Sequence, residues 1–176
     1  MWIVERYLRW GILFVGLWLI VWLWSSFGCS NVQTSQMEPY LVRDSFVYVR
    51  NGVSFPDSMT VQQDVVQFEC ALSKEKFNRY VGRIIGKPGD RVRIEKGKVY
   101  RSAKGSSKEE PLPEQYLRPD LMSVTTEEFE EVLVPRDCYW VMGDNRKKKA
   151  DKDSRRFGPI QVHAVDGKIG KMPMSK

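Results

Sequence analysis

The sequence predicts a mainly β protein, in which an antiparallel β domain follows one N-terminal transmembrane helix. Three observations support this prediction. The chain has 176 residues, a length that suits one compact domain and one anchor. No charged residue occurs from Gly11 to Phe27. Beyond that run, short stretches rich in β-branched and aromatic residues alternate with turns rich in Gly, Pro and Asn.

The uncharged run is long enough to cross a membrane once the apolar residues before it are included. As a helix it spans roughly 25 Å, against a bilayer core of about 30 Å. Trp10 and Trp24 stand near its ends, where indole rings favour the headgroup level. Arg6 and Arg9 precede the run and the next cationic residue is Arg43, so the positive-inside rule keeps the N-terminus in the cytoplasm. We expect a single-pass protein of the plasma membrane, with residues 1–9 cytoplasmic, 10–28 in the lipid bilayer and 29–176 forming the extracytoplasmic β domain.

Charge and cysteine content exclude some functions and leave others open. The net charge of +6 comes as mixed acidic and basic residues in the exported part, so we expect solvated faces and no nucleic-acid partner. Ser26 to Cys29 loosely resembles a lipoprotein processing site, which leaves lipidation at Cys29 as an alternative. A disulfide between Cys70 and Cys138 is compatible with the sequence but not required by it. No cluster of cysteine and histidine suggests a metal, and we expect no cofactor.

The β domain is expected to begin soon after the anchor. Period-two patterns and β-forming residues predict strands at residues 45–49, 64–68, 80–85, 91–94, 99–100 and 135–142. Glycine and proline predict turns at residues 51–52, 56–57 and 87–90, and a hairpin at 95–98. Residues 102–118, rich in Ser, Lys, Glu and Pro, are expected to form an exposed excursion. Residues 125–131 are expected to form a short helix capped by Thr125 or Thr126, and residues 147–149 a charged loop.

Three stretches, in this order along the chain, resemble a known family. They are Met37-Glu38-Pro39, the segment Arg-Ile-Ile-Gly-Lys-Pro-Gly-Asp from Arg83 to Asp90, and Gly143-Asp144-Asn145 leading to Asp153-Ser154-Arg155. Together they resemble the signature boxes of the type I signal peptidases, and the resemblance covers nearly the whole chain. It implies the family's signal-peptidase-like antiparallel β fold.

The resemblance also implies where catalytic groups would stand. In the family, a serine before Met-x-Pro is the nucleophile, a lysine before the arginine of the second box is the general base, and a further serine orients that lysine. Those positions hold Gln36, Gly82 and Asp151 here. Because an amide is no useful nucleophile and glycine offers no base, the resemblance predicts a catalytically inactive member. The expected site support is Asp151, Asp153, Ser154 and Arg155, and the expected peptide groove is Gln36, Met37, Pro39, Gly82 and Arg83.

Neighbouring residues offer weaker alternatives for catalysis. Ser35 precedes Gln36, and in an extended segment its side chain would face away from the groove. Thr34 shares a face with Gln36 and could donate a hydrogen bond, as the family's oxyanion-hole hydroxyl does, but has no evident base beside it. His163, the single histidine, is expected at a surface or strand end. We expect Gln36 to fill the space of the missing lysine, with its amide reaching Asp151 or a backbone carbonyl.

These observations predict a protein that holds exported polypeptide as an added β-strand without cutting it. Similarity to non-catalytic relatives encoded with pilin genes in Gram-positive bacteria implies a pilin subunit as partner and a role in pilus assembly. One alternative is an active type I signal peptidase that processes signal peptides of secreted proteins with Ser35 or Thr34 as nucleophile. Another is a surface-binding module that takes no peptide.

Overall fold

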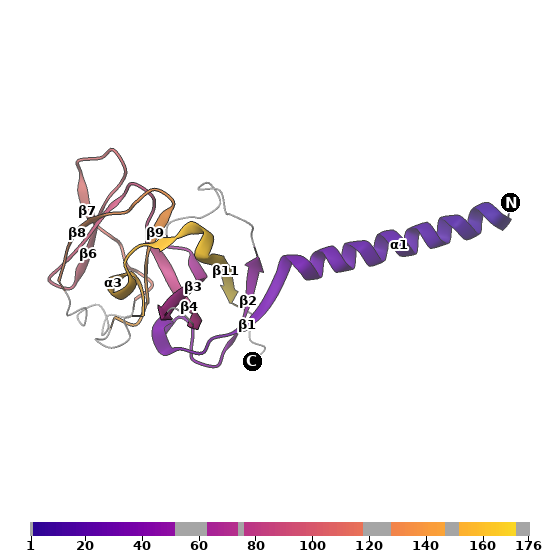
Figure 1. Ribbon diagram of the computed structural model, residues 1–176, viewed down its shortest axis with the longest axis horizontal. Helices are drawn as coiled ribbons and strands as arrows, with labels where there is room; N and C mark the ends of the chain where they lie inside the picture. Colours follow the sequence, from indigo (N-terminus) through magenta and orange to yellow (C-terminus); the bar gives the residue numbers. More distant parts are fainter. Residues whose placement is uncertain (1, 52–62, 74–75, 118–127, 147–151, 172–176) are drawn as a thin grey trace.

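The computed structural model describes residues 2–51, 63–73, 76–117, 128–146 and 152–171. Helix α1 (Trp2–Ser26) extends away from a β domain, and the N-terminus lies at its far end (Figure 1). Strand β1 (Phe27–Asn31) follows α1 directly. Within these described ranges, no helix has both the length and the apolar character needed to cross a membrane.

A seven-stranded antiparallel sheet lies next to α1 (Figure 1). In sheet order its strands are β1, β2 (Phe46–Asn51), β11 (Val165–Lys171), β3 (Val65–Ser73), β4 (Lys76–Gly86), β9 (Cys138–Met142) and β10 (Ile160–Gln161). Strands β3 and β4 are paired over nearly their whole length, from Val65 opposite Arg83 to Ser73 opposite Lys76. Strand β9 pairs with β4 only from Arg83 onward, with Arg83 opposite Met142. This pairing brings the signature segment that begins at Arg83 close to the one that begins at Gly143.

A four-stranded sheet lies at the end of the molecule away from α1 (Figure 1). Its order is β7 (Glu109–Pro111), β6 (Lys98–Ser102), β5 (Arg91–Glu95) and β8 (Phe129–Leu133). Val92 and Ile94 of β5 are buried while Arg91 is exposed, as the alternating sequence predicts. Lys96 and Gly97 both have positive φ in the β5–β6 hairpin, as a two-residue turn that matches strand twist requires.

Within the described part of the chain, three apolar clusters and three short helical turns accompany the two sheets. The turns are η1 (Ser35–Met37), α3 (Ser154–Phe157) and η2 (Val162–Ala164). One cluster packs Met37 of η1 against β2 and β3. A second lies against β3, β4 and β9 and includes Phe68 and Val141, and a third joins Trp140 to the four-stranded sheet. The turns η1 and α3 are therefore held against the strands that carry the signature segments.

The mainly antiparallel β class is confirmed, and so are the expected strands and the turn at residues 87–90. The expected helix at residues 125–131 is wrong where the structure describes it, because Phe129–Leu133 pairs with β5 as β8. The expected excursion at 102–118 is also partly wrong. It contains β7, and Leu117 at its end is buried. Strands β1, β10 and β11 were not expected.

Several expectations fall on residues outside the described ranges: the turns at Gly52 and residues 56–57, the capping residues Thr125 and Thr126, and the loop at 147–149. The sequence left open a disulfide between Cys70 and Cys138. Cys29, Cys70 and Cys138 are all free thiols, so Cys70 and Cys138 do not form a disulfide.

Candidate functional site

Turn η1 places Gln36 in the interior, at the position where the family resemblance implies a nucleophile. The side chain is 2% exposed. Its Nε2 donates a hydrogen bond to the backbone carbonyl of Lys152, one of the two kinds of partner expected from the sequence. Its Oε1 has no hydrogen-bond partner among the described residues. Asn145 holds the turn in place, donating from its backbone N–H to the Gln36 carbonyl at 2.9 Å and from Nδ2 to the Ser35 carbonyl at 3.0 Å.

Gly82, at the position of the implied base, faces a closed interior. A Cβ added there would lie 2.3 Å from Cγ1 of Val141 and 3.4 Å from Cε1 of Phe68. Contacting carbon atoms normally lie about 3.5–4.0 Å apart. The space that the first carbon of a lysine side chain would need is therefore occupied by Val141, which is fully buried in β9.

The groove expected from the sequence needs correction, because most of its residues are buried. Met37 is 0% exposed and belongs to an apolar cluster, and Gln36 is equally inaccessible. Arg83 is 6% exposed and points into a polar network. Pro39 is only half-buried, whereas Gly82 is covered. These side chains shape the interior beneath the site, and a ligand would have to contact other residues.

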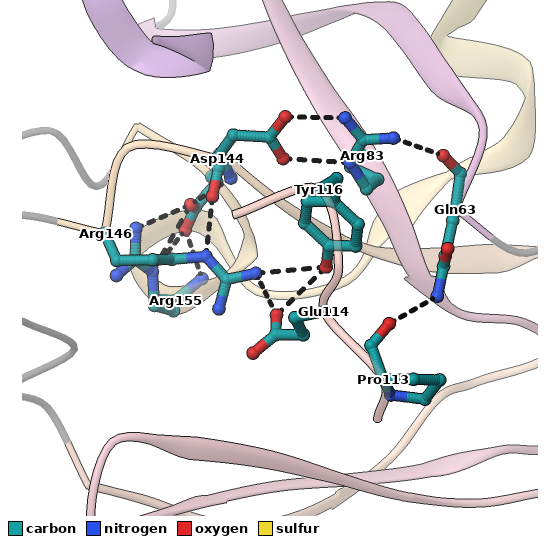
Figure 2. Close-up of polar contacts among 10 residues, drawn as sticks. Gln63, Arg83, Pro113, Glu114, Tyr116, Asp144, Arg146 and Arg155 are labelled. Atoms are coloured by element: carbon teal, nitrogen blue, oxygen red, sulfur yellow. Dashed lines mark hydrogen bonds and ion pairs between the residues drawn. The ribbon is translucent and has the colours of Figure 1, made fainter. Parts of the chain in front are cut away.

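Arg83 forms a buried ion pair with Asp144, which joins β4 to the loop after β9 (Figure 2). Arg83 Nε lies 2.9 Å from Asp144 Oδ1 and Nη2 lies 2.5 Å from Oδ2, a two-point contact between planar groups. Nη1 donates to the Gln63 carbonyl at 2.8 Å. The guanidinium carbon lies 4.0 Å from the ring centroid of Tyr116 and 5.0 Å from that of Tyr40. Burial opposes the charge of Arg83, but Asp144 outweighs that effect and raises its pKa.

A second buried arginine ties the segment before β8 to the same network (Figure 2). Arg146 donates from Nη2 to a carboxylate oxygen of Glu114 and from Nε to the Gly143 carbonyl, the latter at 2.8 Å. Tyr116 donates its hydroxyl to Glu114 at 2.9 Å. Burial raises the pKa of Tyr116 well above its ordinary value, and the carboxylate of Glu114 adds to the rise against the opposing charge of Arg146. The phenol therefore stays protonated and serves as a donor.

The start of helix α3 contacts β9 and the loop that follows it. Asp153 accepts from the Gly143 N–H at 2.8 Å and pairs with Arg155 Nη2, also at 2.8 Å, so two of the expected support residues form an ion pair. Both side chains are at most 1% exposed. Ser154 Oγ accepts from the Val141 N–H at 2.8 Å and so anchors the strand that closes the Gly82 position. Asp151, the fourth expected support residue, lies outside the described residues.

The alternative nucleophiles lie in different surroundings. Ser35 is exposed on η1. Thr34 lines a surface groove of about 380 Å³, and no lysine is among the described residues that line it. His163 lies at a separate hollow of about 390 Å³, beside Cys70 and Phe157. Burial raises the pKa of the Cys70 thiol, which reduces its thiolate fraction at neutral pH. Among the described side chains, no group of His, Cys, Asp or Glu is arranged to hold a metal ion.

The groove beside Thr34 contains residues that the sequence did not single out. It is lined on one side by β1 and the segment after it, including Asn31 and Gln33, and on the other by Asn78 and Arg79 of β4. Gln67 of β3 also lines it. The available signal was the amide side chains that follow α1, which a strand prediction at residues 27–31 would have placed on a sheet edge.

The chain is similar to known signal peptidases in sequence and in structure. The profile of the family described as signal peptidase, peptidase S26, matches residues 5–173. The chain is 31% identical over 144 residues to signal peptidase I of Bacillus caldolyticus, which covers 78% of this chain and 74% of that protein. It is 32% identical over 130 residues to a probable signal peptidase I-2 of Synechocystis sp., covering 73% of this chain and only 55% of that protein. A crystal structure of a signal peptidase I from Enterococcus faecalis V583 aligns with a TM-score of 0.48 and 25% identity, covering 68% of this chain and 100% of that one.

Proposed function

The chain belongs to the signal peptidase family, peptidase S26, and from that premise we propose that it is a non-catalytic member that binds exported polypeptide without cleaving it. The observation that carries the proposal is the state of the two catalytic positions. Gln36 is buried with its amide bonded to the backbone, and the Gly82 position is closed by Val141. An amide does not attack a peptide carbonyl, and no base can be placed at residue 82 without moving a buried strand.

Peptide binding does not need the missing groups. Among the described residues, β1 pairs only with β2, and β4 pairs with β9 only from Arg83 onward. The outer edge of β1 and the first half of β4 therefore present backbone N–H and C=O groups along the groove that Thr34 lines. An extended segment can hydrogen-bond to such edges as an added strand, with affinity that comes from its main chain. The buried pair Arg83–Asp144 ties β4, one of the strands that line the groove, to the loop after β9.

The proposal includes a membrane anchor. The sequence has no charge from Gly11 to Phe27, and the preceding Arg6 and Arg9 favour a cytoplasmic N-terminus. Helix α1 extends away from the β domain (Figure 1), so an anchor within α1, ending before β1 begins at Phe27, would hold the groove on the outer side of the plasma membrane. A site there would meet polypeptides as they leave the membrane. A pilin subunit is one such polypeptide, and assembly of a pilus is the role that we propose for it.

Photo-crosslinking to a preprotein tests the proposal. A photoreactive residue at Gln33, which lines the groove, should capture an exported preprotein whose signal peptide ends in Ala-x-Ala. The same residue at Arg156, which is exposed on α3 and does not line the groove, is the matched control. The captured preprotein should keep its full mass. Capture no greater than at Arg156 would refute peptide binding and favour a surface module of another kind, whereas a shortened product would refute the non-catalytic assignment.

If the chain is an active enzyme, the groove indicates which hydroxyl would be its nucleophile. Of the two alternative nucleophiles, Thr34 lines the groove, whereas Ser35 is exposed on η1 and is not among the residues that line it. If the chain cleaves a preprotein, turnover should therefore be lost in Thr34→Val and retained in Ser35→Ala. The opposite pattern would identify Ser35 as the nucleophile.

A further inference from the structure

The groove between β1 and β4 has a polar lining. The groove, a hollow of about 380 Å³, shares Cys29, Ser30, Gln67 and Arg79 with a neighbouring hollow of about 310 Å³. We call the two hollows together the trough. The uncharged polar side chains that line the larger hollow are Ser30, Asn31, Gln33, Thr34, Gln67 and Asn78. Val81 is the one large aliphatic side chain among the described residues of that hollow.

At the floor of the trough, the one arginine is shared between two carboxylates. Arg79 Nε lies 3.0 Å from Glu69 and 3.5 Å from Asp166, so one cation faces two carboxylates. Gln67, which is 5% exposed, donates from Nε2 to Asp166 Oδ2 at 2.9 Å. An anionic ligand side chain would find no unpaired cation here, and the excess negative charge of the two carboxylates would disfavour it.

A small apolar side chain would also be a poor fit to this floor. A methyl group that covers Gln67 and the Arg79–Asp166 pair would remove water from polar atoms without replacing its hydrogen bonds. A hydroxyl or amide would replace them. In a bound strand, alternate side chains point to the same face, so every second residue of the ligand meets the floor.

Building on the proposed function, we propose that the groove selects an extended polypeptide segment whose alternate side chains are polar and not anionic, such as serine, threonine or asparagine. It would thus discriminate against the alanines of an Ala-x-Ala cleavage site. The selection comes from hydrogen bonding to the lining amides and hydroxyls, while the main chain pairs with the edges of β1 and β4. The ligand class is set by this chain's own side chains and does not depend on the missing catalytic groups.

Two synthetic peptides test the inference on the full chain in detergent micelles. Both are capped nonapeptides of identical sequence, except that alternate positions carry threonine in one and alanine in the other. Fluorescence anisotropy should show about three- to tenfold tighter binding of the threonine peptide, the difference expected from one or two neutral hydrogen bonds. Equal affinity, or tighter binding of the alanine peptide, would overturn the inference and leave the proposed function standing. Failure of both peptides to bind would overturn the proposed function together with the inference.

Substitutions locate the selectivity. Gln67→Met keeps the side-chain length and removes the amide, so the preference for the threonine peptide should fall to twofold or less. Gln33→Met makes the same change at an exposed position, where folding is not at risk, and should reduce the preference in part. Gln161→Met, on an exposed residue of the separate hollow beside His163, is the control and should leave the preference unchanged. A preference that survives both Gln67→Met and Gln33→Met would contradict the assignment to this groove.

Discussion

Adding one methyl group at Gly82 is expected to destabilise the β domain, because Val141 already occupies the space. The new Cβ would lie 2.3 Å from Val141 Cγ1, more than 1 Å inside the usual contact distance of about 3.5–4.0 Å. Val141 is 0% exposed, so it has little room to move, and we expect Gly82→Ala to cost about 1–3 kcal/mol. When Val141→Ala is made as well, the clash is removed and the cost of Gly82→Ala should fall below about 0.5 kcal/mol.

A double-mutant cycle measures this coupling on the full chain in micelles. Pulse proteolysis in urea reports unfolding of the β domain without interference from the tryptophans of α1. At an m value of about 2 kcal/mol/M, a loss of about 2 kcal/mol lowers the urea midpoint by about 1 M. Gly82→Ala combined with Val99→Ala, a valine buried in another cluster, should be additive within about 0.5 kcal/mol. Additive costs with Val141→Ala, or no cost for Gly82→Ala alone, would refute the conclusion that Val141 closes the base position.

Two further predictions concern the buried polar network. Asp144→Asn leaves the guanidinium of Arg83 buried without its counter-charge and should lower the free energy of unfolding by about 3–5 kcal/mol. Glu131→Gln breaks an exposed pair and should lower it by less than about 1 kcal/mol. Equal urea midpoints for the two variants would contradict this prediction. Burial raises the pKa of Tyr116 above its usual value of about 10, so its protonated phenol contributes stability that is complete below about pH 10 and is lost as the pH rises further. The wild-type midpoint should therefore fall more steeply than that of Tyr116→Phe between about pH 9 and pH 11, and parallel curves would rule out this account of Tyr116.

Local patterns were enough to predict most of the β domain. Strand β5 is predicted by the alternation of charged and apolar residues along it. The Lys-Pro-Gly-Asp turn before β5 is predicted by the φ preferences of proline and glycine. Strand β8 was mistaken for a helix because threonine and glutamate favour capping and helix formation in isolation. Pairing of Phe129–Leu133 with β5 overrides that preference. Strand β11 contains two glycines that lower its strand propensity, yet Gly170 must lack a side chain because a Cβ would lie 1.9 Å from the ring of Tyr48.

The candidate site was predictable at its centre but not in its surroundings. Gln36 and Gly82, which the family resemblance aligns with a nucleophile and a base, are located by the signature segments alone. The sequence does not show that Val141 fills the space beside Gly82, because pairing of β4 with β9 brings Val141 there. Tyr116 was hidden in a segment whose average composition is polar, although its own ring packs over Arg83. The groove was misplaced for a related reason, since the signature side chains lie beneath the surface.

The most direct test of the central claim is a multiple-turnover assay with a preprotein whose signal peptide ends in Ala-x-Ala. The full chain in micelles is incubated with excess preprotein, and intact mass spectrometry follows the product over time. We expect no signal-peptide release from the wild type or from Gln36→Ser, because residue 82 still provides no base. Time-dependent release by the wild type that is abolished by Thr34→Val or Ser35→Ala would contradict the account.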